Sequence, residues 1–579
     1  MIKKSLLVSS LLLASSMGLW AQDSFFETTN YVGALTADAS ADWTKTGWTE
    51  FNPKNAVYPA VNETTTLAAG NGVIEITNEV VLDASKVYLL SGVVAIKSGG
   101  SLVIPAGTVI RGLSNIDATA GTTNYSMIVV EPGGKIFANG TAAKPVVFTS
   151  NKDAGSRERG DWAGILLFGK AVTNAGATQT MEGFNKVTVY QNGAGGVFGG
   201  TDNADNSGTL KYVRIEFAGL ALDVNKEVNA LTLGTVGSGT TVDYVQCSYS
   251  NDDSFEWFGG TVNAKHLIAY HGTDDDFDTD NGFSGKVQFG IGIKKPDYFD
   301  LTYSAASGAS TSEGFESDND ASGSTNKPYT SAQFMNFTMV GPISLDSTYA
   351  TTMNATTKNA FRRGARLRRN TKQTITKTIF MGYRNFLMID GSASLANYGV
   401  SLSPQVVRTD SALFKTNLIV STAAAASAGS NNTGLVEVAN VTVSGSTDAT
   451  ATATNRDLLD AWTKLSANEN WIKTERTDWG KGLILVDPQN WTNPDFRPVA
   501  NITVGINDQT VYSSEEVYPN PVASNGVLHI SATEEVYTLT NAQGVVVASG
   551  KNNKIALNNI AKGMYVLNVN NKVSKVVVE

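Results

Sequence analysis

The sequence predicts an all-β protein whose body is a right-handed parallel β-helix, a solenoid in which each coil adds a strand to every sheet. Strands of three to five residues follow one another from about Val73, separated by Gly-rich or Asn-containing turns, and one acidic motif recurs after 22 residues. The chain is rich in Gly, Thr, Ser, Asn and Val and has little helical periodicity. These features are typical of solenoid coils. A β-sandwich, with longer strands and hairpin signals, is the alternative.

The first part of the body shows the strand pattern most clearly. Short apolar runs are bounded by Gly99-Gly100, Pro105-Ala106-Gly107 and Gly112, residues that favour turns. The strands predicted here are Ile74–Thr77, Val80–Leu82, Val87–Leu90, Val93–Lys97, Ser101–Ile104, Thr108–Arg111, Met127–Glu131, Gly134–Phe137 and Val146–Thr149.

Both ends of the chain differ from this body. Residues 1–21 read as a secretory signal peptide, with Lys3 and Lys4 before an apolar stretch and Ala21 at its end. Residues 22–72 are then an N-terminal leader or cap, and 73–505 the solenoid. A short helix near 456–465 is expected to close its C-terminal end. A linker at 506–516 precedes a small all-β sandwich at 517–579.

Composition excludes several classes of protein. The single cysteine, Cys247, rules out intramolecular disulfides and is expected to be buried in an alternating strand. Without the signal peptide, 42 basic and 53 acidic residues leave a net charge of −11, which argues against nucleic-acid binding. The chain has only three histidines, so a zinc site with several histidine ligands is not expected. No transmembrane segment is expected in the mature chain.

A short acidic motif around phenylalanine occurs at Asp253–Glu256, Asp275–Asp278 and Glu313–Glu316. Aligning the three copies gives a first acidic column of Asp253, Asp275 and Glu313, a column of Phe255, Phe277 and Phe315, and a second acidic column of Glu256, Asp278 and Glu316. Alternation along a strand turns the phenylalanines inward with the first acidic column on the same side, and the second acidic column outward. Stacked carboxylates about 4.8 Å apart repel by roughly 1 kcal/mol per neighbour in water.

Three interpretations of these carboxylates stay open. Ca²⁺ would relieve the repulsion, since it prefers six to eight oxygen ligands. The residues predicted to bind it are Asp253, Asp275, Asp276, Asp278, Glu313 and Glu316. A solvated acidic face needs no ion, and a catalytic carboxylate pair would use raised pKa values. Asp252-Asp253 and His271-Gly272 echo parts of the catalytic set of polygalacturonases, but no matching Arg-x-Lys follows.

The segment Phe361–Arg369 carries five arginines. Arg362, Arg363 and Arg366 are candidates for binding an anionic polysaccharide, because guanidinium groups pair with planar carboxylates. Alternatively, the arginines of this segment face outward on one coil and partly neutralise the neighbouring acidic columns.

The last residues include Val517-Tyr-Pro-Asn-Pro-Val522, a Gln543-Gly544 turn and the strand Gly563-Met-Tyr-Val566. This order resembles the C-terminal sorting tail of Bacteroidetes proteins exported by type IX secretion. Segments such as Gly160-Asp-Trp-Ala-Gly-Ile165 and Glu256-Trp-Phe-Gly-Gly260 make the body similar to uncharacterised secreted β-helix proteins of the same group. The resemblance implies export to the cell surface or release, with the secretion machinery as a partner.

A non-enzymatic binding or adhesive surface protein, with coils stabilised by Ca²⁺ and a surface polysaccharide or other glycan as ligand, is the first functional expectation. A polysaccharide-active lyase or glycosidase that uses carboxylates of residues 252–320 is the alternative. Carboxylates converging on one ion-sized gap favour the first, and two carboxylates about 5–10 Å apart in an open groove favour the second.

Overall fold

The computed structural model divides the chain into two units, Met1–Ile502 and Thr503–Glu579. It describes residues 25–438 and 517–579, except 30–32, 36–41, 114, 118–121, 191–194, 224–225, 296–297, 300–311, 342–362, 382, 384, 399–400, 403–404, 407–413, 416–417, 421–428, 431–435, 519, 531–535, 542–545, 552, 559 and 570–571. The predicted signal peptide, the helix near 456–465 and the linker at 506–516 lie outside the described residues.

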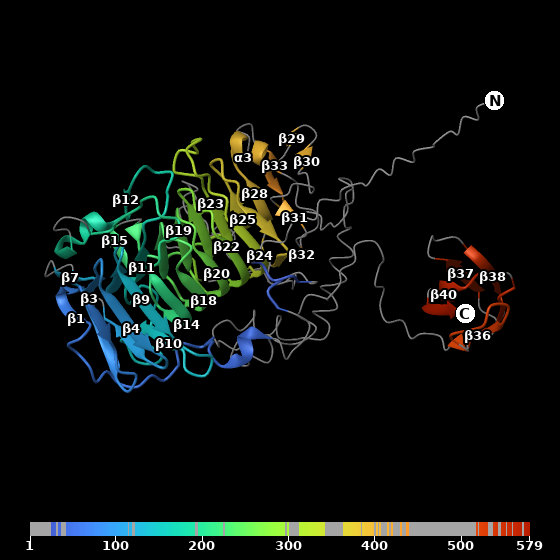
Figure 1. The fold of residues 1–579 in the computed structure, drawn as a ribbon, viewed down its shortest axis with the longest axis horizontal. Helices are drawn as coiled ribbons and strands as arrows, with labels where there is room; N and C mark the ends of the chain where they lie inside the picture. Colours follow the sequence, from blue (N-terminus) through green and yellow to red (C-terminus); the bar gives the residue numbers. More distant parts are fainter. Residues whose placement is uncertain are drawn as a thin grey trace, which may run out of the picture. The chain divides into compact units, whose positions relative to one another are not determined.

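The first unit is a parallel β-helix, as the sequence predicted (Figure 1). Its strands form three stacks. The first stack contains, in order, β1 (Ala68–Ile76), the second half of β3 (Val87–Ile96), β8 (Met127–Val130), β11 (Gly164–Phe168), β17 (Leu231–Gly234), β19 (Phe255–Phe258), β21 (Phe277–Asp280), β23 (Phe315–Ser317), β25 (Arg363–Leu367) and β28 (Asn385–Ile389).

The other two stacks share five long strands. The second stack contains β2 (Glu79–Val81), β4 (Ser101–Pro105), β9 (Lys135–Asn139), the first halves of β14 (Gly208–Glu216), β18 (Thr241–Ser248), β20 (Asn263–Tyr270), β22 (Lys286–Ile293) and β24 (Gln333–Val340), then β26 (Thr374–Thr376) and β31 (Phe414–Lys415). The third contains the first half of β3, β5 (Val109–Gly112), β10 (Val146–Ser150), the second halves of the five long strands, β27 (Ile379–Met381) and β32 (Leu418–Val420).

The remaining elements of the first unit are short helices and short antiparallel strand pairs. They are η2 (Trp43–Thr46), η3 (Phe184–Lys186), η4 (Thr188–Tyr190), α3 (Ser392–Asn397), the antiparallel pairs β6 (Asn115–Asp117) with β7 (Thr122–Asn124), β12 (Gln179–Thr180) with β13 (Val197–Phe198), β15 (Ala221–Asp223) with β16 (Lys226–Glu227), β29 (Ser401–Leu402) with β30 (Gln405–Val406), and β33 (Gly429–Ser430) with β34 (Val436–Val438). None of the helices in the described residues is long and apolar enough to cross a membrane.

The predicted phenylalanine column lies inside the solenoid. Phe255, Phe277 and Phe315 occupy equivalent positions on β19, β21 and β23, and all three side chains are fully buried. The ring centroids of Phe255 and Phe277 are 5.4 Å apart, and those of Phe277 and Phe315 are 5.5 Å apart. The column therefore joins three coils through ring contacts, which adds to the area that each ring buries.

The long strands turn a corner between the second and third stacks at a residue with left-handed backbone geometry. Tyr212, Tyr244, His266 and Phe289 hold this position in successive coils, with φ between 51° and 62°. Such φ values are unfavourable for residues with a Cβ atom. Stacking of the side chains offsets part of the cost, since the rings of Tyr212 and Tyr244 lie 4.3 Å apart and those of Tyr244 and His266 4.1 Å apart.

The residues before the first coil form an N-terminal strap, defined here as the described part of residues 25–63. It runs along the solenoid in the direction opposite to the coils: Glu27 contacts Gln288, Glu50 contacts Gln246, and Tyr58 contacts Glu216. The two glutamine side chains each accept from a strap N–H and donate to the carbonyl of the same strap residue. These contacts place the strap along the side of the coils.

The second unit contains two antiparallel sheets, as expected for a small β-sandwich. One is formed by β35 (Val517–Tyr518), β36 (Val527–Ile530) and β39 (Lys554–Ala556), the other by β38 (Val546–Lys551), β37 (Val536–Asn541), β40 (Gly563–Val569) and β41 (Lys572–Val578). Their shared core includes Leu528, Leu539, Ile555, Leu567 and Val576, which are fully buried.

Candidate metal centre

The acidic columns lie on and just before consecutive strands of the first stack. Because β19, β21 and β23 are in register, Glu256 lies opposite Asp278, and Asp278 opposite Glu316. Glu256 and Asp278 are half-buried, and Glu316 is 9% exposed. The first column, at the turns leading into these strands, is buried more deeply: Asp253, Asp275 and Glu313 are 6%, 5% and 0% exposed.

The first acidic column is a ladder of hydrogen bonds between coils. Asp253 Oδ1 accepts from the backbone N–H of Asp275 over 2.7 Å, and Asp275 Oδ1 accepts from the N–H of Glu313 over 2.5 Å. Glu313 Oε2 accepts from the N–H of Arg363 over 2.9 Å. Each carboxylate thus satisfies the buried N–H of the equivalent residue one coil later, a charge-assisted bond stronger than one between neutral groups.

An arginine ends this ladder. The guanidinium of Arg363 donates to Glu313 Oε1 through Nη1 over 2.8 Å, and both side chains are at most 4% exposed. Carboxylates buried in this way need a cation, an arginine or protons to offset the loss of hydration. For Glu313 the structure provides the arginine.

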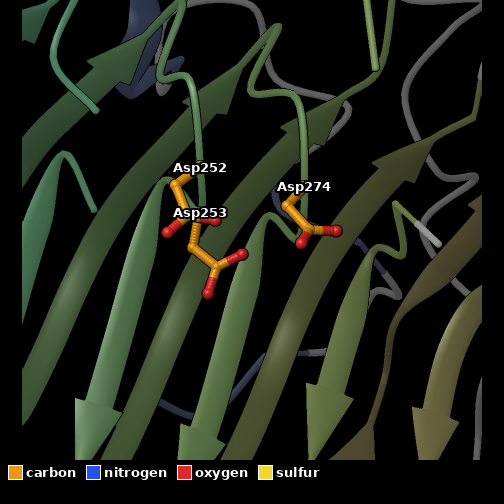
Figure 2. Close-up of side chains that lie close together, drawn as sticks. All are labelled: Asp252, Asp253 and Asp274. Atoms are coloured by element: carbon orange, nitrogen blue, oxygen red, sulfur yellow. The ribbon is translucent and has the colours of Figure 1, made fainter. Parts of the chain in front are cut away.

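Three groups of carboxylates bring their oxygens within 4.8 Å of one another: Asp253, Glu256 and Asp278; Asp275, Asp278 and Glu316; and Asp252, Asp253 and Asp274. Asp278 is common to the first two groups and Asp253 to the first and third. Figure 2 shows the third group, in which Asp252 and Asp253 follow each other on one turn and Asp274 lies on the neighbouring one. Carboxylate oxygens at such spacing are suitable ligands for a hard divalent cation.

The pKa values of these groups are shifted upward. Burial raises the pKa values of Asp253 and Glu256 well above the ordinary range, with further increases from Asp252 and Asp278 respectively. Burial likewise raises the pKa values of Asp275 and Asp278. So many carboxylates in one water-poor place cannot all ionise unless positive charge is added.

Two of the six predicted calcium ligands, Asp276 and Glu313, belong to none of the three groups. Asp276 pairs with Lys294, whose Nζ is 3.1 Å from Asp276 Oδ1, and both side chains are fully buried. Burial still raises the pKa of Asp276 to about 7. Glu313 pairs with Arg363 as described. The other four predicted ligands, Asp253, Asp275, Asp278 and Glu316, are the ones that the structure brings together.

The arginine segment borders the acidic groups on the coil that follows. Arg366 Nη1 lies 3.2 Å from Glu316 Oε1, and Arg368 Nε lies 2.7 Å from Asp318 Oδ1. Arg369 Nη1 is also 2.7 Å from Asp318, and Arg368 contacts Glu316 as well. These described arginines therefore neutralise part of the acidic face. Arg362, another predicted ligand-binding residue, lies outside the described residues.

Sequence reasoning missed Asn229. It precedes β17 by two residues, the position that Asp253 holds before β19, so it belongs one coil earlier in the first column. Its side chain is 1% exposed and donates through Nδ2 to Glu256 Oε2. The pattern of acidic residues could not reveal it because Asn carries no charge; only the register of Leu231 with Phe255 does.

Two residues considered for catalysis or reactivity are buried. His271 is 4% exposed, its ring stacks on Tyr270 at 3.7 Å, and burial lowers its pKa well below the ordinary value. Cys247 is fully buried, as expected, and burial raises the pKa of its thiol.

Comparison with protein families agrees with both units. A family model described as a pectate-lyase like beta helix domain matches residues 74–482, and one described as a secretion system C-terminal sorting domain matches residues 516–579. Neither the curated proteins nor the solved structures compared with the chain give a match. The sorting domain indicates export by type IX secretion to the cell surface or the medium. The chain therefore belongs to the pectate-lyase-like β-helix family and carries a C-terminal secretion sorting domain.

Proposed function

We propose that this exported β-helix is a binding or adhesive surface protein whose acidic coils are stabilised by Ca²⁺. The observation that carries the proposal is the position of Asp278, whose carboxylate belongs both to the group with Asp253 and Glu256 and to the group with Asp275 and Glu316. One ion in either group would bridge adjacent coils. Convergence on ion-sized gaps is the arrangement that favours a bound cation over a separated catalytic pair.

Two further features support a cation. Asp278 Oδ1 is buried without a hydrogen-bond partner among the described residues, which is costly for a carboxylate oxygen. The arginines pair with Glu316, the last member of the second acidic column, and with Asp318 two residues further on. In the earlier part of the two columns, no described Lys or Arg forms an ion pair with Asp253, Glu256 or Asp278. An ion would supply the positive charge that this earlier part lacks.

Calorimetric titration of the exported chain with Ca²⁺, alongside thermal unfolding in chelator and in millimolar Ca²⁺, tests the proposal. A ligand at 100 times its Kd that binds only the folded state stabilises it by about 2.7 kcal/mol. Asp278→Asn should abolish most of the calcium-dependent rise in Tm, because it weakens both groups. Asp153→Asn, at an exposed carboxylate outside the groups, is the matched control. Equal Tm values with and without Ca²⁺ would remove the ion and leave a solvated acidic face.

A polysaccharide-active enzyme is the second candidate, supported by the description of the matched family as pectate-lyase-like. Its catalytic groups would be carboxylates of the same face, with the nearby Arg366 and Arg368 to bind an anionic sugar. Glycan-array binding and polysaccharide depolymerisation, each with and without Ca²⁺, separate the two functions. Release of shortened sugar chains, lost in Asp278→Asn, would favour the enzyme; binding without release would favour the adhesive protein.

A further inference from the structure

Exposed apolar side chains concentrate in the sorting domain. Six of the ten large hydrophobic side chains described as exposed belong to residues 517–579, a small part of the described chain. The domain nevertheless has its own core, in which Leu539 and Leu567 are fully buried. The exposed apolar side chains are therefore not part of the hydrophobic core. Clusters of exposed apolar side chains are typical of interaction sites.

Four of them gather on one face of the sheet β38-β37-β40-β41. Val536, Val546, Met564 and Val566 are 57%, 52%, 61% and 44% exposed. Strand register makes three of them neighbours: Thr540 lies opposite Val546 on one side and Val566 on the other, and Met564 is two residues before Val566 on the same strand. We call this surface the tail face.

Positive charge borders the tail face. Lys575 lies opposite Val566, and Lys551 opposite Val536. Residues 517–579 contain five lysines and three glutamates, a net charge of +2 (5 − 3), whereas the whole chain carries −9. A complementary partner would present an apolar centre with an acidic rim, because matched charges favour encounter and orientation.

We propose that the tail face is the docking surface on which the secretion machinery recognises this protein, through a protein surface of that chemistry. Residues 516–579 match a secretion system sorting domain, and sorting requires that a protein partner recognises the surface of this domain. Apolar residues at the centre supply most of the affinity in such interfaces, and the charged rim supplies selectivity. A second copy of the tail is the competing occupant.

The test uses the full chain in a host that has the type IX system, with the protein quantified in the periplasm, on the surface and in the medium. Met564→Lys combined with Val566→Lys places charge in the centre of the tail face and should reduce export about tenfold. Val527→Lys is the matched control, since Val527 is 42% exposed but lies on β36 of the other sheet. It should be exported like the wild type.

Two further variants keep the outcome interpretable. Met564→Gln combined with Val566→Thr removes apolar surface with little change in size, and should impair export even if the lysine variants prove unstable to proteolysis. Lys575→Glu should also impair export, whereas Lys575→Arg should not. Normal export of both double variants, or an equal defect in Val527→Lys, would overturn the proposal. A purified precursor that dimerises, with the dimer lost in the double variants, would assign the tail face to self-association instead.

Discussion

The carboxylate of Asp253 accepts a hydrogen bond from the backbone N–H of Asp275, which holds the same position one coil later, over 2.7 Å. The same bond recurs from Asp275 to Glu313, and from Glu313 to Arg363. The repeated acidic residue is thus a structural bond between coils as well as a source of negative charge. The hydrogen bond between coils explains why an acidic residue recurs at this position, although the carboxylates of neighbouring coils repel one another.

Replacing Asp253 should reveal its structural role. Asp253→Ala leaves the buried N–H of Asp275 without its acceptor, and should lower the free energy of unfolding by about 1–3 kcal/mol. Asp253→Asn keeps an acceptor oxygen and should cost less. Denaturant unfolding in chelator measures the two values, and an Asn variant less stable than the Ala variant would contradict the ladder.

The pair of Glu313 and Arg363 offers a second test. Arg363→Met leaves a buried carboxylate without this guanidinium, and breaking such a pair on one side costs about 3–5 kcal/mol. Adding Glu313→Gln removes the charge and should restore part of the loss. If the double variant is as unstable as the sum of the two single variants, the two side chains do not interact energetically.

The phenylalanine column should dominate the packing of the acidic coils. Phe277 is buried between Phe255 and Phe315. Phe277→Ala should therefore cost about 3–5 kcal/mol, as large truncations in a core do. Val81→Ala, at a side chain 60% exposed, is the control and should change the free energy of unfolding by less than about 0.5 kcal/mol.

This column was predictable from the sequence because two simple periods fix it. A 22-residue spacing brings Phe255 and Phe277 to the same position in successive coils, and alternation along a strand then decides which side chains point inward. The predicted strands Val87–Leu90 and Val93–Lys97 were also found, but as one strand, β3, bent at Gly92 with φ +76°. Glycine allows this bend, across which β3 changes its partner from β5 to β8.

Other features could not be read from local patterns. Tyr244 and His266 adopt left-handed geometry that their residue types disfavour, so only the stacked coils reveal the corner. The strap depends on contacts such as Glu50 with Gln246, 196 residues apart. The same applies to the candidate site. The repeat identified its carboxylates, but it could not reveal the hydrogen bond of Asn229 to Glu256 or the ion pair of Lys294 with Asp276. Both contacts follow from three-dimensional packing.

The strap should depend on its glutamine contacts. Gln246 Nε2 donates to the carbonyl of Glu50 over 2.6 Å, and its Oε1 accepts from the N–H of the same residue over 3.0 Å. Gln246→Ala should destabilise this contact by about 1–3 kcal/mol. Hydrogen exchange of residues 42–51 should accelerate, while Gln333→Ala, at an exposed strand end, should leave it unchanged. Unchanged exchange in Gln246→Ala would mean that ring contacts, such as those of Trp43 and Trp48 with Tyr244, hold the strap without this hydrogen bond.

The raised pKa values predict an unusual dependence of stability on pH. Burial and the neighbouring Asp318 raise the pKa of Asp280 from 3.8 to about 8, and the pKa values of Asp253, Glu256, Asp275 and Asp278 shift in the same direction. The folded protein therefore holds protons that the unfolded chain releases. This stabilisation is fully present below the unfolded pKa and is lost as the pH rises through the folded one, here between about 4 and about 8. In chelator, Tm should therefore fall over this window.

Bound Ca²⁺ should reverse much of that loss. The ion requires ionised ligands, so its binding competes with protons and strengthens as the pH rises. The difference in Tm between millimolar Ca²⁺ and chelator should accordingly be larger near pH 8 than near pH 5, by the linkage between proton and metal binding. Asp278→Asn should reduce the difference most at the higher pH, and Asp153→Asn should leave it unchanged. A calcium effect that is larger at the lower pH would contradict binding to these carboxylates, because protons would then assist the ion instead of competing with it.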